Sequence, residues 1–114
     1  AVTPAALPGS ETAEWAEVVD KDGAYANEIT LRSLDLLRCY EPISFVELIA
    51  PTPLLMIVAD QDTQTPVAWQ RQAFERAGEP KKLVALQGRH YDPYTLLLDE
   101  SRRAALDWFR EHLQ

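Results

Sequence analysis

Hydrophobic residues in the second half of the chain are grouped in the way that two short buried strands require. Residues 54–59 read Leu-Leu-Met-Ile-Val-Ala and residues 83–86 read Leu-Val-Ala-Leu, so both segments are apolar at every position. A strand covered by helices on both faces has this uninterrupted pattern, whereas a strand with one solvated face alternates apolar and polar residues. The pattern therefore predicts two buried strands of a parallel sheet.

Each predicted strand is followed by a segment with the pattern of a helix. Residues 66–77 begin with Pro66 near the first helical position, Thr65 is a candidate N-cap, and Gly78 ends the segment. A longer helix is predicted from Asp92 or Pro93 to residue 113, and its apolar stripe consists of Leu97, Leu98, Ala104, Ala105, Trp108 and Phe109. Strand, helix, strand and helix in this order form a βαβα unit, in which a right-handed crossover makes the two strands parallel neighbours.

The first half of the chain has helical patterns that are interrupted by turn signals. Residues 1–10 contain two prolines and a glycine and are predicted to be irregular. Helices are predicted over residues 11–19, 27–40 and 44–49, of which the second is amphipathic.

Three titratable side chains lie just beyond the carboxyl ends of the predicted strands. Asp60 and Asp62 follow the first strand, and His90 follows the second. Ligands of an open α/β sheet bind in the crevice at this edge. We therefore expect a carboxylate and an imidazole to meet there, with His90 as a base and either aspartate as its partner. An ordinary place in a surface turn is the alternative for each of them.

From about residue 15 onward the sequence resembles the C-terminal part of an α/β hydrolase. The resemblance is carried by an apolar strand, Asp62-x-x-x-Pro66, a helix, a second strand and Gly88-x-His90, in which the histidine comes 28 positions after the aspartate. The order Asp then His is also that of the last two members of the hydrolase triad. Three further segments resemble a branch of bacterial hydrolases and fungal polyketide transferases, namely residues 27–33, 40–42 and 51–55.

The resemblance implies an α/β fold in which residues 51–114 are the C-terminal βαβα edge of a hydrolase sheet. Residues 1–50 would then form a helical cap or linker segment. It also implies Asp62, in preference to Asp60, as the triad acid and His90 as the triad base. The implied substrate is a small ester, thioester or other acyl compound, and the implied chemistry needs no metal and no organic cofactor.

The nucleophile of such a triad is absent from this sequence. The chain has four serines, Ser10, Ser33, Ser44 and Ser101, and none of them lies in a Gly-x-Ser-x-Gly turn. We expect the nucleophile to come from a missing N-terminal segment or from a second chain, and a homo-oligomer is a further way to complete the sheet. Two parallel strands do not form a stable sheet by themselves.

A different class of function stays open beside this one. The chain could be a complete small protein that serves as a non-catalytic interaction or assembly module and keeps a hydrolase-like βαβα segment. The uncovered edge of an apolar strand seeks a partner, which favours such a role.

Composition and charge exclude several other classes. A formal net charge of −7 argues against nucleic-acid binding, because that binding depends on neutralising phosphates with Lys and Arg. No apolar run approaches the length of a membrane span, so no membrane association is expected. The one cysteine, Cys39, cannot form an internal disulfide, so a cytoplasmic location is the simplest expectation. Cys39 is predicted to be a small core residue.

Overall fold

The computed structural model describes residues 9–24, 26 and 28–113. Most of the segment that was predicted to be irregular, residues 1–8, lies outside the described residues. The chain divides into two compact units, Ala1–Glu41 and Pro42–Gln114, and each is described by itself. Among the described residues, no helix combines the length and the apolar character that crossing a bilayer requires.

The first unit contains two helices, α1 (Ser10–Val19) and α2 (Leu31–Cys39). The prediction that α2 starts at residue 27 is wrong, because Thr30 is its N-cap: the Thr30 Oγ1 atom accepts a hydrogen bond from the Ser33 backbone N–H at 3.1 Å. Cys39 is exposed at the end of α2, so its prediction as a core residue is also wrong.

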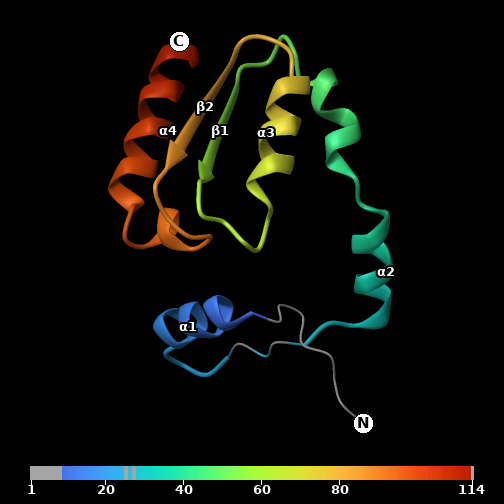
Figure 1. Cartoon of the computed structure of the whole chain (residues 1–114), viewed down its shortest axis with the longest axis vertical. Helices are drawn as coiled ribbons and strands as arrows, with labels where there is room; N and C mark the ends of the chain where they lie inside the picture. The colour runs from blue at the N-terminus through green and yellow to red at the C-terminus, as the bar shows by residue number, and fades with distance from the viewer. Residues whose placement is uncertain (1–8, 25, 27, 114) are drawn as a thin grey trace. The chain divides into compact units, whose positions relative to one another are not determined.

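The second unit is an α/β structure built on two parallel strands, β1 (Leu54–Ala59) and β2 (Lys81–Leu86). The helix α3 (Val67–Arg76) connects them, and α4 (Leu98–His112) follows β2. Two 3₁₀ helices complete the unit, η1 (Pro42–Leu48) before β1 and η2 (Asp92–Tyr94) before α4. Figure 1 shows α3 and α4 on either side of the two strands, which run in the same direction. The predicted α/β fold class is confirmed.

The buried hydrophobic residues of the second unit come from both strands and from the helical segments around them, including Val46 of η1 and Ala77 after α3. Val58, Ala59 and Leu86 of the strands and Trp108 of α4 are 7% exposed or less. Phe109, which was predicted to lie on the apolar stripe of α4, is 54% exposed. The long helix predicted from residue 92 is divided, because the Asp92 carbonyl accepts hydrogen bonds from two backbone N–H groups that close a turn, those of Thr95 and Leu97.

Lys81 extends β2 before its apolar stretch and also closes the end of α3. Its Nζ atom donates hydrogen bonds to the carbonyl oxygens of Phe74, Glu75 and Ala77 at 2.8, 3.1 and 2.7 Å. The same ammonium group lies 4.8 Å from the centroid of the Phe74 ring. The last carbonyls of a helix have no partner within the helix, and a cation at this end also interacts favourably with the helix dipole.

The 3₁₀ helix η1 lies against α3 in the second unit. Residues 42–48 lie within the predicted cap or linker segment, residues 1–50. The contact includes an ion pair between the Arg76 Nε and Glu47 Oε1 atoms at 2.9 Å.

Candidate active site

The two loops that carry the predicted site residues leave the sheet side by side. Ala59 and Leu86 are partners in the parallel register and are the last residues of their strands. Backbone hydrogen bonds continue the pairing into the loops, from the Asp60 N–H to Leu86 O at 2.9 Å and from the Gln61 N–H to Gly88 O at 3.0 Å. The loops are therefore fixed to each other before either reaches its acidic or basic side chain.

The structure brings Asp62 and His90 together at this edge. The Asp62 Oδ2 and His90 Nδ1 atoms are 2.9 Å apart, which is hydrogen-bond distance for a charge-assisted pair. The side chain of Asp62 is 5% exposed and that of His90 is 25% exposed. The carboxylate is thus enclosed, while the imidazole keeps access to a ligand.

Asp60, the alternative acid, has a different partner. Its Oδ1 atom accepts a hydrogen bond from the Gly88 backbone N–H at 3.2 Å. Asp60 therefore connects the two loops, and Asp62 is the aspartate that contacts the imidazole.

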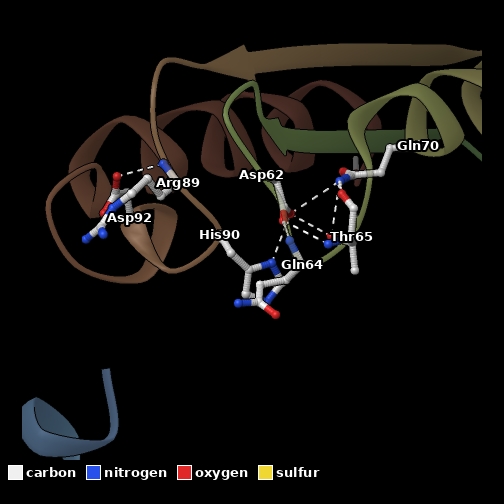
Figure 2. Close-up of polar contacts among 7 residues, drawn as sticks. All are labelled: Asp62, Gln64, Thr65, Gln70, Arg89, His90 and Asp92. Atoms are coloured by element: carbon white, nitrogen blue, oxygen red, sulfur yellow. Dashed lines mark hydrogen bonds and ion pairs between the residues drawn. The ribbon is translucent and has the colours of Figure 1, made fainter. Parts of the chain in front are cut away.

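Asp62 is held by its own loop in an Asx-type turn. Its Oδ1 atom accepts hydrogen bonds from the backbone N–H groups of Gln64 and Thr65 at 2.8 and 2.9 Å. Its Oδ2 atom accepts one from the Thr65 hydroxyl at 2.6 Å. As Figure 2 shows, these donors and the imidazole of His90 converge on one carboxylate. Such a carboxylate has little freedom to rotate.

These contacts lower the pKa of Asp62 from 3.8 to about 2. Burial by itself raises the pKa, but the hydrogen bonds from the Thr65 hydroxyl, from His90 and from the backbone of Thr65 and Gln64 outweigh it. Asp62 is therefore ionised at neutral pH and can only accept hydrogen bonds. It follows that the Nδ1 atom of His90 carries the proton of this bond, which leaves the lone pair of a neutral imidazole on Nε2.

The loop of His90 is equally constrained. The Arg89 backbone N–H donates a hydrogen bond to the Asp92 Oδ2 atom at 2.7 Å, on the side of the loop away from Asp62 (Figure 2). The ring of Tyr91 stands edge-on to the imidazole, with 4.6 Å between the ring centroids. Asp92 thus fixes the backbone that presents His90.

A hollow of about 310 Å³ adjoins the Asp62–His90 pair. Its lining residues are Ile57, Ala59, Asp62, Thr65, Gln70, His90, Pro93, Tyr94 and Ser101. The described part of the chain contains no group of three His, Cys, Asp or Glu side chains that could hold a metal ion. The side chains of Asp62, Thr65 and His90 in the lining can exchange protons and can form hydrogen bonds with a small polar group.

Two residues that support Asp62 were not predicted from the sequence, Thr65 and Gln70. Thr65 was predicted to cap α3, but the N-cap residue is Pro66 and makes no side-chain cap, and the Thr65 hydroxyl serves Asp62 instead. The spacing Asp-x-x-Thr before a proline was the available signal. Gln70, whose Nε2 atom lies 2.7 Å from the Thr65 carbonyl oxygen, had no such signal, because a glutamine in the first turns of a helix is usually solvated.

Two fungal proteins are similar to this chain in sequence. A polyketide transferase from Gibberella fujikuroi is 37% identical over 67 residues, which are 58% of this chain and 21% of that protein. The polyketide transferase grgF from a Penicillium species is 27% identical over 88 residues, which are 76% of this chain and 30% of that protein. No protein-family model matches the sequence.

Two solved structures are similar to this chain in fold. The crystal structure of the α/β hydrolase GrgF from Penicillium sp. sh18 has a TM-score of 0.76 and 25% identity, covering 90% of this chain and 36% of that one. The structure of DcsB in complex with its substrate analogue has a TM-score of 0.75 and 24% identity, covering 92% of this chain and 37% of that one. The chain thus has an α/β-hydrolase-like fold, resembles fungal polyketide transferases, and spans less than a third of either curated relative.

Proposed function

We propose that this chain supplies the acid and the base of an acyl-transfer active site. Asp62 orients the imidazole, His90 acts as the general base, and the nucleophilic serine comes from sequence outside these 114 residues. The observation that carries the proposal is the 2.9 Å bond between the two side chains, made by an aspartate that its own loop holds in place.

The tautomer of His90 fits the role of a general base. With the Nδ1 proton directed at Asp62, the Nε2 atom takes the proton of the serine hydroxyl as its oxygen attacks an acyl carbonyl carbon. The imidazolium then gives this proton to the leaving group, and the acyl group stays on the serine. The ionised Asp62 stabilises the imidazolium between these two steps.

The relatives support an acyl chain as the transferred group. Two of them are named polyketide transferases, and we propose a polyketide ester or thioester as the acyl donor. Either water or an alcohol can release the acyl group from the serine, which gives hydrolysis or transfer by the same machinery.

The second edge of β1 is the proposed place for the missing part of the sheet. Among the described residues of the second unit, β1 pairs with β2 alone. A further strand on this edge, from an N-terminal segment, a second chain or another copy, would place a strand-end loop beside the hollow that Ile57 and Ala59 line. We propose that a strand-end loop of this missing part carries the serine.

A second candidate function is a non-catalytic assembly module. The same uncovered edge of β1 favours it. So do the apolar side chains exposed on α2, namely Leu31, Leu34, Leu36 and Leu37. An assembly module needs the edge and the exposed side chains but has no use for an ordered aspartate–histidine pair.

Labelling with an alkyl fluorophosphonate separates the two functions. This reagent reacts with serines that a general base activates, and the experiment uses the natural protein that contains this sequence. We expect labelling of one serine and turnover of an aryl thioester, and we expect His90→Ala to lower both rates by about 10³-fold or more. His112→Ala, which changes the other histidine of the chain, should keep the wild-type rates. A His90→Ala protein that reacts as fast as the wild type would contradict the proposal and leave the assembly role.

A further inference from the structure

We propose that Gln70 is a positioning residue, which acts through Thr65 and Asp62 to hold the His90 imidazole in its Nδ1–H tautomer. The inference deepens the proposed function and rests on it for the effect on catalysis. Its geometric part concerns three hydrogen bonds made by one amide group, and this part can be tested without any substrate.

The amide of Gln70 faces three oxygen atoms. Its Nε2 atom lies 2.7 Å from the Thr65 carbonyl oxygen, 3.2 Å from the Thr65 Oγ1 atom and 3.4 Å from the Asp62 Oδ2 atom. The carbonyl oxygen and the ionised carboxylate can only accept hydrogen bonds. The amide must therefore present its NH₂ group to them, which fixes the orientation of the Gln70 side chain.

The Thr65 hydroxyl is engaged on both sides. A hydroxyl group has one proton to donate and can also accept. The ionised Asp62 carboxylate can only accept, so the hydroxyl donates its proton to the Asp62 Oδ2 atom, 2.6 Å away, and its oxygen accepts from Gln70. The bonds thus run in one sense, from Gln70 to Thr65 to Asp62, and hydrogen bonds in such a series strengthen one another.

Asp62 lies between this series and the histidine. Figure 2 shows Thr65 and Gln70 on one side of the carboxylate and His90 on the other. The same Oδ2 atom accepts from the Thr65 hydroxyl and from the Nδ1 atom of His90. If the bond from the Thr65 hydroxyl is lost and the carboxylate rotates, the bond from His90 Nδ1 is misaligned as well.

Gln70 is the member of the series that stands on a regular element. It belongs to α3, whereas Asp62 and Thr65 belong to the loop before this helix. Side chains on helices are placed more reproducibly than those on loops, and a site needs such support to keep its geometry. Because Gln70 stands on α3, its hydrogen bonds hold the Thr65 hydroxyl and the Asp62 carboxylate in a fixed position relative to this helix.

The chain provides a matched control for this residue. Gln72 is a second glutamine of α3 and is exposed, so its replacement changes helix propensity as a change at Gln70 does without touching the series. The proposal is tested with Gln70→Ala, with Gln70→Glu, which keeps the shape but replaces the NH₂ donor by an acceptor, and with Gln72→Ala.

The measurement is the tautomer of His90, read from the ¹⁵N chemical shifts of its two ring nitrogens at an alkaline pH where the imidazole is neutral. We expect wild-type protein and Gln72→Ala to hold His90 as the Nδ1–H tautomer. In Gln70→Ala and in Gln70→Glu the ratio of Nδ1–H to Nε2–H should fall roughly 3- to 10-fold, the range for loss of one net hydrogen bond. Thermal unfolding midpoints of the same proteins report any general loss of stability.

The outcomes separate the inference from the proposed function. An unchanged tautomer ratio in folded Gln70→Glu overturns the inference, even if the unfolding midpoint falls, because it leaves Gln70 only a structural role. If the ratio falls and the protein transfers acyl groups, we expect about a 10-fold lower kcat at an unchanged KM in Gln70→Glu. If the ratio falls but the wild-type protein has no acyl-transfer activity, the positioning role stands and the proposed function is wrong.

Discussion

The backbone N–H of Gly88 donates a hydrogen bond to the Asp60 carboxylate at 3.2 Å, and this bond joins the loop of the candidate acid to the loop of the candidate base. Gly88 has no room for a side chain. A Cβ atom built there would lie 2.6 Å from the Leu97 Cδ1 atom and 2.9 Å from the Asp92 Cβ atom. The glycine therefore permits the close approach that places His90 opposite Asp62.

Replacing this glycine should disturb both stability and the site. We expect Gly88→Ala to lower the free energy of unfolding by about 1–3 kcal/mol, the usual effect of overpacking, and to weaken the contact between Asp62 and His90. Urea unfolding measures the first effect and the ¹⁵N shifts of the imidazole measure the second. Gln87→Ala, at the exposed neighbouring position, should leave both unchanged. Equal stability of Gly88→Ala and the wild type would show that Leu97 and Asp92 move aside without cost.

The low pKa of Asp62 predicts a loss of stability in acid. Its pKa is about 2 in the folded protein, and the unfolded chain has the ordinary value of 3.8. As the pH falls, Asp62 is therefore protonated in the unfolded chain before it is protonated in the folded protein. The stabilisation is present above about pH 4, is lost as the pH falls from about 4 to about 2, and amounts to roughly 2 kcal/mol.

Asp62→Asn removes the titrating group and tests this prediction. The difference in unfolding free energy between wild type and Asp62→Asn should change by roughly 2 kcal/mol between pH 5 and pH 2. Chemical denaturation at a series of pH values provides the measurement. Two curves that stay parallel over this range would mean that the folded and unfolded chains bind the proton equally well.

The two strands could be predicted because each contains an uninterrupted run of apolar residues that is visible in the local sequence. A strand covered on both faces is apolar throughout, and β1 has this pattern over its full length. The same pattern does not predict Lys81 and Lys82 as strand residues, because they are polar. They belong to β2 because they pair with β1. The meeting of Asp62 and His90 was predictable in outline, because parallel strands end at one edge.

The support of the site was not predictable, because it depends on how two loops approach each other. The choice between Asp60 and Asp62 rested on a resemblance, and only the coordinates show that one bonds to Gly88 and the other to His90. The role of Gln70 depends on the direction in which α3 leaves the loop. No periodicity in the sequence carries this information.

The Thr65 hydroxyl should account for part of the ionisation of Asp62. We expect Thr65→Val to raise the pKa of Asp62 above about 2, because its shortest hydrogen bond is lost while the burial that opposes ionisation remains. Thr65→Ser keeps the hydroxyl and should stay close to the wild type. The ¹³C shift of the Asp62 carboxyl group, followed over pH, gives the value directly. A Thr65→Val protein with an unchanged Asp62 titration would assign the low pKa to His90 and to the backbone N–H donors.

The bond from Lys81 to the end of α3 should stabilise the unit that holds the site. A hydrogen bond from a charged donor contributes about 1.5–3 kcal/mol, so we expect Lys81→Met to lower the unfolding free energy by roughly this amount while keeping the aliphatic part of the side chain. Lys82→Met changes the exposed neighbour and should shift it by less than about 0.5 kcal/mol. Both are read from urea unfolding at neutral pH.

Because Lys81 acts at the amino end of β2, away from Asp62 and His90, the tautomer of His90 should stay as in the wild type in the folded Lys81→Met protein. Similar losses in the two variants would show that the three carbonyl groups find equally good partners in water.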